Sequence, residues 1–319
     1  MIKLVVCDID GTILEKGKTE IDKDTVLALE NLHKNGKIIC FASGRTYFSM
    51  RKIAESLSFV DDIYYICCDG AICIYRDKVL YHKQISIENM LKFARNPDYS
   101  SKAIMYYSDK FAYITGSTPE LLDELEKESI DHLDPISGIY DVKSPIFKIG
   151  VHGFGARPEK LIPCPFELRV AYDAGDIVEY TSRFANKGLA VSDLQMRLYL
   201  SKLDTAAFGD GDNDIEMFSK AKYTFAKRSG SEALKAFIHE HGKPIVLEAE
   251  PPTDALSIRR IKFYERIGLT LYDFPYMQPA YTEDSHPVEL RLMGTIDTEA
   301  TPLTDVEQQL HREVYGFFG

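Results

Sequence analysis

The sequence contains no tryptophan, no apolar run of about 20 residues that could span a bilayer, and no cysteine pair in CxxC spacing. Without that spacing, the cysteines give no basis for a zinc or dithiol motif. Most of them lie in or beside expected core strands, and we predict small buried thiols. The six are Cys7, Cys40, Cys67, Cys68, Cys73 and Cys164.

Positive charge is also scarce, because 38 Lys and Arg residues face 49 Asp and Glu residues, a net charge of -11. This balance provides no basic footprint for nucleic acid and weakens adhesion to an anionic membrane. The 319 residues, 45% of them hydrophobic, can bury large cores in two or more domains. Since the chain opens directly with a core strand, we expect a cytoplasmic protein.

What the chain does contain is carboxylates at strand ends. Asp8-Ile9-Asp10-Gly11-Thr12 follows the apolar run Leu4 to Cys7. Asp8 and Asp10 stand two residues apart, so in an extended chain both side chains leave on one face. One could attack a phosphorus atom while the other moves a proton, although such a pair also fits a turn or a helix cap.

Three later segments favour the catalytic interpretation. Ser43-Gly44-Arg45 follows a second apolar strand, Lys187 precedes a helical pattern, and a third strand ends in the acidic run 210–214. Hydroxyl, amide and guanidinium groups are good phosphate ligands.

The carboxylates need a counter-charge. Asp8, Asp10, Asp210 and Asp214 would meet in one cleft, where each pair near 4 Å repels by about 1 to 4 kcal/mol. A cation would offset this repulsion. An all-oxygen ligand set without Cys or His points to Mg²⁺.

In this order, the motifs DxDGT, SGR, a lone Lys and GDxxND resemble the haloacid dehalogenase-like superfamily of phosphatases, and specifically its Cof-type branch. The resemblance covers residues from Met1 to about Ala226. It implies an α/β fold with a Rossmann-like, mostly parallel sheet, dependence on Mg²⁺, and hydrolysis of small phosphate monoesters.

The resemblance also implies roles for the motif residues. Asp8 would be the nucleophile that forms an aspartyl-phosphate, Asp10 the acid/base, and Lys187 a counter-charge. Asp8 and Asp210 would hold Mg²⁺ by side chain and Asp10 by its carbonyl. Asp214 would orient waters or Lys187 more plausibly than bind the ion directly.

Phosphoryl oxygens would meet Ser43 and the amides near Ile9 and Gly44. Arg45 and Asn213 would contact the substrate or support the site, although Arg45 could equally form an internal salt bridge.

One motif departs from the family. Where the family usually has Asn-Gly-Ala facing the substrate, this chain has Asp69-Gly70-Ala71. The change replaces an amide by a pure hydrogen-bond acceptor. The substrate group met by Asp69 is therefore expected to differ.

The same resemblance divides the chain. Residues 1–84 and 178–248 would form the phosphatase core, and 85–177 an inserted α+β cap, a lid that excludes water and selects the leaving group. Within the cap, Lys148, His152 and Arg157 could meet substrate, but we favour a solvated surface role for them.

Residues 249–319 form an additional α+β segment. Lys243-Pro244-Ile245-Val246-Leu247-Glu248 and 259–269 look like the second half of a GNAT-type N-acetyltransferase, and we place the start of this resemblance near Arg228-Ser229-Gly230-Ser231. The first half is missing, so we expect no acetyl transfer and a core role for Tyr264. An unpaired apolar edge in this segment would favour a homodimer.

The sequence thus predicts a Mg²⁺-dependent phosphomonoester hydrolase acting on a small phosphorylated metabolite, and we favour a sugar phosphate. A sugar phosphomutase is the competing enzyme. A non-catalytic module that binds a phosphometabolite or CoA is the alternative of another class, and the intact Asp8 and Asp10 argue against it.

Overall fold

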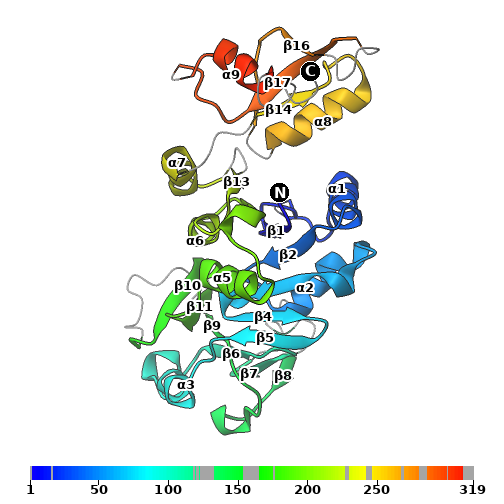
Figure 1. The fold of residues 1–319 in the computed structure, drawn as a ribbon. Helices are drawn as coiled ribbons and strands as arrows, with labels where there is room; N and C mark the ends of the chain where they lie inside the picture. Colours follow the sequence, from blue (N-terminus) through cyan, green and yellow to red (C-terminus); the bar gives the residue numbers. More distant parts are fainter. Residues whose placement is uncertain are drawn as a thin grey trace. The chain divides into compact units, whose positions relative to one another are not determined.

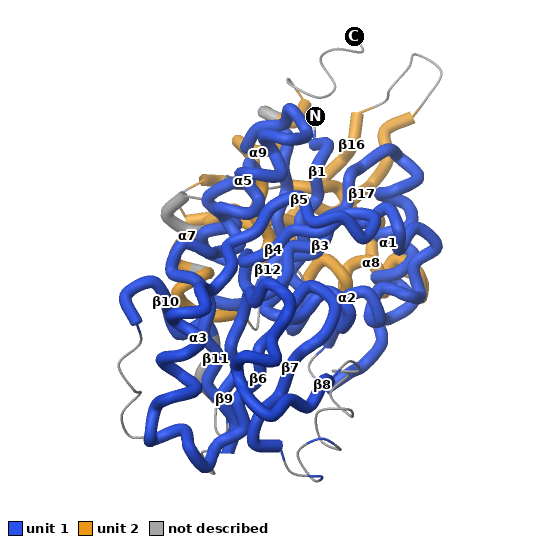
Figure 2. Tube along the Cα trace, turned by 90° about the horizontal axis from the view of Figure 1, so that it is seen from below, with its two compact units in different colours: residues 1–222 blue, residues 223–319 orange. Residues whose placement is uncertain are grey.

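The computed structural model describes residues 2–15, 17–117, 119, 122, 133–153, 165–174, 177–226, 230–241, 246–266, 269–279, 286–299 and 301–311. The chain forms two compact units, residues 1–222 and 223–319, which Figure 2 colours separately. Three sequence predictions, for Arg157, Cys164 and the turn at Arg228-Ser229, lie outside the described residues.

The first unit is built on a mostly parallel sheet, here called the core sheet, in which consecutive neighbours are β12-β1-β2-β3-β4-β5 (Figure 1). β1 lies between β12 and β2 and is parallel to both, and β2 is parallel to β3. β4 and β5 continue the sheet antiparallel. The strands are β1 Leu4–Cys7, β2 Ile38–Ala42, β3 Tyr64–Cys67, β4 Ile72–Tyr75, β5 Lys78–His82 and β12 Thr205–Gly209.

Helices cover both faces of the core sheet. Alternate residues of β1, such as Val5, share a buried cluster with Leu29 of α1 and Met50 of α2. α5 contacts β3 and β4 and packs beside α6. The helices are α1 Lys23–Lys34, α2 Tyr47–Ile53, α5 Lys187–Arg197 and α6 Ile215–Phe218. The predicted α/β fold with a mostly parallel, Rossmann-like sheet is confirmed.

A second sheet of the first unit, here called the cap sheet, has the strand order β10-β11-β9-β6-β7-β8. One face packs on α3 Ile87–Ala94 through Met90 and Phe93. The opposite face carries Met105 and Tyr107. The strands are β6 Ala103–Tyr107, β7 Ala112–Thr115, β8 Leu133–Pro135, β9 Lys148–His152, β10 Leu168–Ala174 and β11 Ile177–Ser182.

The structure corrects one predicted boundary. The sequence predicted a return to the core at residue 178, but β11 pairs with β10 over residues 177–182 and with β9 over residues 177–181. The hairpin of β10 and β11 therefore belongs to the cap sheet. The first core element after it is α5, which begins at Lys187 with Asn186 as its N-cap.

The second unit is a smaller α+β assembly. Its longest strand, β17, pairs antiparallel with β14, β15 and β16. Phe225 and Tyr264, both partly buried, pack with Ile261 and Met293 in one of its cores. The elements are β13 Tyr223–Ala226, α7 Glu232–His241, β14 Val246–Ala249, α8 Ala255–Arg266, β15 Thr270–Leu271, β16 Tyr276–Gln278, β17 Val288–Gly294 and α9 Leu303–Leu310.

The sequence analysis assigned residues up to 248 to the phosphatase core. In the structure β14 instead pairs with β17, within the second unit. Across the described parts of both units, no helix combines the length and the apolar character that crossing a bilayer requires.

Candidate active site

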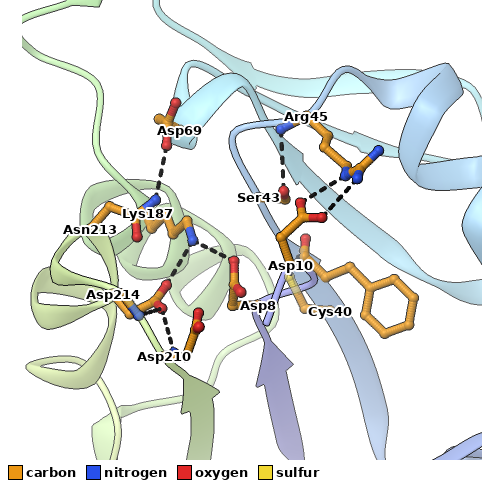
Figure 3. Close-up of polar contacts among 12 residues, drawn as sticks. Asp8, Asp10, Cys40, Ser43, Arg45, Asp69, Lys187, Asp210, Asn213 and Asp214 are labelled. Carbon is orange, nitrogen blue, oxygen red and sulfur yellow. Dashed lines mark hydrogen bonds and ion pairs between the residues drawn. The ribbon is translucent and has the colours of Figure 1, made fainter. Parts of the chain in front are cut away.

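The centre of the site is a buried lysine between two carboxylates. Lys187, the first residue of α5, donates from Nζ to Asp8 Oδ1 and to Asp214 Oδ1, each at 2.7 Å (Figure 3). The lysine is 1% exposed, Asp8 5% and Asp214 not at all. The chain thus brings together a strand end, a helix start and the turn after β12, although Lys187 lies 179 residues beyond Asp8.

Burial and neighbouring charges together set the protonation of Asp8 and Lys187. It raises the pKa of Asp8 to about 7, while the ammonium of Lys187 opposes that rise. Burial opposes the charge on Lys187, but Asp8 and Asp214 outweigh it and raise the lysine pKa. Lys187 is therefore a fixed positive charge in the site.

Three carboxylates could hold a metal ion. One oxygen from each of Asp8, Asp210 and Asp214 lies within 4.8 Å of the other two. Asp214 Oδ2 also accepts from the backbone amides of Asp210 and Gly211, both at 3.0 Å, so its two oxygens already have protein partners. This donor set of oxygens suits Mg²⁺.

Asp210 fits its place because Gly11 has no side chain. A Cβ on Gly11 would lie 2.0 Å from Asp210 Oδ2, and Gly11 also has a φ of +84°. Glycine alone adopts that conformation without steric cost. The Gly of the first motif therefore makes room for the carboxylate of the last.

Asp10 lies apart from this cluster and is paired with arginine. Arg45 donates from Nε to Asp10 Oδ2 and from Nη2 to Asp10 Oδ1, both at 2.7 Å. Its Nη1 donates to Ser49 Oγ at 3.0 Å. The structure thus contains the internal salt bridge that the sequence left as an alternative for Arg45.

Two loops meet beside Asp8: residues 43–45, called the Ser43 loop, and residues 68–70, called the Asp69 loop. Asp69 N donates to Ser43 O at 3.0 Å, and Cys68 N donates to Arg45 O at 2.9 Å. Asp69 itself is 3% exposed, and its Oδ1 accepts from Asn213 Nδ2 at 3.2 Å.

The Asp69 loop also touches the start of α5. A Cβ on Gly70 would lie 2.2 Å from the carbonyl oxygen of Asn186, so no other residue fits at that contact. The predicted site residues from Asp8 to Asp214 are thereby gathered around the ends of β1, β2, β3 and β12.

The cap contributes a buried lysine next to this site, which the sequence did not predict. Lys148 of β9, predicted to be a solvated residue, is 4% exposed and donates to Gly44 O at 2.9 Å. It also pairs with Glu179 of β11 at 2.7 Å and lies over the ring of Tyr107. His152 is buried as well.

The local pattern favours exposure of Lys148. It alternates with the apolar Phe147, Ile149 and Val151, which places it on the opposite face of a strand from these apolar side chains. Its partner Glu179 lies 31 residues away, and no local pattern links the two.

The remaining cysteine predictions agree with the structure. Cys7, Cys40, Cys67, Cys68 and Cys73 are all buried free thiols. Burial raises the pKa of Cys7 to about 12, so this neighbour of Asp8 stays protonated.

Comparison with known proteins places this geometry in context. A Mycoplasma genitalium protein is 28% identical over 265 residues, covering 74% of this chain and 89% of that protein. The HMP-PP phosphatase of Yersinia pestis strain Pestoides F is 27% identical over 234 residues, covering 69% and 81%.

Solved structures share the fold. A haloacid dehalogenase-like hydrolase from Bacteroides thetaiotaomicron superposes with a TM-score of 0.65 at 21% identity, covering 74% of this chain and 92% of that one. A sugar phosphatase of HAD subclass IIB gives 0.60 at 20% identity, covering 74% and 91%.

The sequence model of haloacid dehalogenase-like hydrolases matches residues 5–243. This match spans the four motifs and confirms the expectation of an enzyme of the hydrolase class. The chain therefore belongs to the haloacid dehalogenase-like hydrolase family.

Proposed function

We propose that this protein is a Mg²⁺-dependent phosphomonoester hydrolase that acts on a small phosphorylated metabolite, such as a sugar phosphate, through an aspartyl-phosphate. One observation carries the proposal: Asp8 stands at a strand end, bound by Lys187, with oxygens of Asp210 and Asp214 close by. Binding alone would not require this combination of a held nucleophile and a cation site.

Asp8 and Asp210 would hold the ion by side chain, Asp10 would contribute its carbonyl oxygen, and Asp214 would act through Lys187 and the backbone amides that it already binds. The bound Mg²⁺ supplies charge neutralisation at the phosphoryl group. Lys187 adds a fixed positive charge on the same side of Asp8.

The first half-reaction forms a bond between an Asp8 oxygen and phosphorus while the ester P–O bond breaks. Asp10 donates a proton to the leaving oxygen. In the second half-reaction water attacks the phosphorus, Asp10 takes the water proton, and Asp8 leaves as a free carboxylate. Ser43 and the amides near Ile9 and Gly44 are the donors that we propose for the phosphoryl oxygens.

Substrate selection would involve the cap. Lys148 brings a cap strand into contact with the Ser43 loop, next to the proposed phosphoryl site. The name of the Yersinia relative supports a small phosphorylated substrate. We propose that residues 83–185 decide which leaving group is accepted.

For the second unit we propose an acetyltransferase-like origin without acetyl transfer. Tyr264 packs in its core rather than standing free for a reaction, which supports a structural role. The test is calorimetric titration of the full chain with CoA, and tight binding would count against a purely structural role. A homodimer through this unit stays a prediction, to be checked by light scattering.

The hydrolase is tested by phosphate release from sugar phosphates, nucleotides and pyridoxal phosphate, with Mg²⁺ or EDTA. We expect metal-dependent turnover in the wild type and a loss of at least about 10³-fold in Asp8→Asn, which removes the nucleophile. Asp273→Asn, at an exposed position of the second unit, is the matched control. Absence of turnover in the wild type would refute the proposal, and isomerised sugar phosphate would point to a mutase.

A further inference from the structure

Asp69 places a buried carboxylate at the edge of the proposed phosphoryl site. Its Oδ2 would lie 3.1 Å from a Cβ on Gly44, so the carboxylate borders the Ser43 loop. Figure 3 shows it beyond the strand ends with Lys187 and Ser43. Its backbone has a φ of 54°, the left-handed region that few residues adopt, and Ser43 O binds its amide.

The nearby cations are already bound to other carboxylates. Lys187 forms ion pairs with Asp8 and Asp214, and Lys148 forms one with Glu179, all at 2.7 Å. The hydrogen bond that the structure shows for the Asp69 side chain comes from Asn213, a neutral amide. Both lysines lie close enough for Asp69 to help raise their pKa, but their hydrogen bonds go to other groups, so Asp69 Oδ2 retains capacity to accept from a further donor.

The charge balance points the same way. With Mg²⁺ bound and the proton of Asp8 displaced, six carboxylates would face three cationic side chains and one divalent ion, which leaves one negative charge in excess among these groups. A substrate phosphoryl group adds further negative charge. The carboxylates are Asp8, Asp10, Asp69, Glu179, Asp210 and Asp214, and the cations are Arg45, Lys148 and Lys187.

We infer that Asp69 is a specificity-determining residue that selects phosphorylated substrates carrying a protonated amine. This inference rests on the proposed hydrolase function. A substrate ammonium would donate to Asp69 Oδ2 and offset the excess negative charge, whereas a hydroxyl at the same position could donate but would bring no charge. A hydroxyl and an ammonium would both make a charge-assisted hydrogen bond to the carboxylate, but only the ammonium adds the attraction between opposite charges.

The test compares glucosamine 6-phosphate with glucose 6-phosphate at about pH 6.5, where an amine of this kind is protonated. We expect kcat/KM to favour the amino sugar about tenfold or more in the wild type, with the difference carried by KM. Asp69→Asn keeps the shape and removes the charge, so the preference should fall by about the same factor. Asp273→Asn removes an equal charge from an exposed position of the second unit, outside the core and the cap, and should keep the preference.

A second comparison changes the substrate and leaves the protein intact. N-acetylglucosamine 6-phosphate has an uncharged amide, and the wild type should treat it no better than glucose 6-phosphate. Equal kcat/KM values for amino and neutral sugars in the wild type, or a preference that survives Asp69→Asn, would overturn the inference.

The inference is separable from the hydrolase proposal. If the wild type released no phosphate from either sugar, the hydrolase would fall, while calorimetric binding of the two sugars to the wild type and to Asp69→Asn would still decide the role of Asp69. Tighter binding of the amino sugar to the wild type alone supports it, and equal binding contradicts it.

Discussion

Arg45 holds both carboxylate oxygens of Asp10, each at 2.7 Å, and so sets the orientation of the proposed acid/base; one of these contacts must open before Asp10 can take up and pass on a proton. The contact is partly exposed, with 49% of the Asp10 side chain open to solvent. A planar guanidinium can bind a carboxylate with two parallel hydrogen bonds, which a lysine cannot reproduce. Arg45 is therefore a positioning residue for Asp10.

Arg45→Lys should lower kcat on alkyl phosphates by about 10-fold or more, because a misdirected acid protonates the leaving oxygen poorly. On p-nitrophenyl phosphate, whose leaving group needs no proton, the loss should be much smaller. Steady-state kinetics with both esters makes the comparison. Equal losses on the two would show that Arg45 binds the phosphoryl group instead of directing Asp10.

Lys148→Met should destabilise the first unit by about 3 kcal/mol, because it leaves Glu179 as a buried charge without its ammonium. Urea unfolding followed by circular dichroism measures the change. The double variant Lys148→Met with Glu179→Leu should recover more than half of the loss, since neither charge remains. No recovery in the double variant would mean that the contact of Lys148 with Gly44 O matters more than the ion pair.

Gly11→Ala should abolish the rise in melting temperature on adding Mg²⁺, since its Cβ would lie 2.0 Å from Asp210 Oδ2. Gly17→Ala is a matched control, because Gly17 has a φ of +79° but nothing within 4 Å of an added Cβ. Both variants should lose about 1 to 2 kcal/mol to the left-handed backbone. An intact Mg²⁺ response in Gly11→Ala would argue against Asp210 as a metal ligand.

Protons and Mg²⁺ should compete for Asp8. Burial raises its pKa from the ordinary 3.8 to about 7 in the metal-free protein, with Lys187 opposing and Asp214 and Asp210 adding to the rise. Between these two values the native state binds more protons than the unfolded chain, so the stability of the metal-free protein falls as pH rises.

Mg²⁺ binding must displace that proton, so the Mg²⁺-induced increase in melting temperature should be larger at about pH 8 than at about pH 5.5. Differential scanning fluorimetry at the two pH values measures it. In Asp8→Asn the proton is absent, and the dependence on pH should largely disappear. A shift in the wild type that is equal at both pH values would contradict the raised pKa of Asp8.

Local sequence patterns predicted the strand ends well. β1 ends at Cys7, just before Asp8, as the apolar run Leu4 to Cys7 indicates. Such features depend on residues that are close in the chain. The family motifs then supplied what the local patterns could not, the meeting of Asp8 with Lys187.

The errors arose where distant segments decide the outcome. Residues 177–182 predict a strand, but their own sequence does not indicate which sheet the strand joins. In the structure this strand pairs with β9, for example Val178 with Val151. Lys148 is buried because Glu179, on the neighbouring strand β11, forms an ion pair with it. A charged residue that the local sequence places in solvent can thus be buried when an oppositely charged residue from a distant segment pairs with it.

The close approach of Gly70 to the carbonyl of Asn186 has a consequence for how the cap can vary. The chain leaves the core after β5 and returns at Asn186, against the loop that carries Asp69 and just before Lys187. The cap lies between these two points, so the positions at which the chain leaves and rejoins the core are fixed. Cap sequences could therefore be exchanged between relatives as cassettes, while the alignment of lysine and nucleophile is set by a backbone contact that the cassette does not contain.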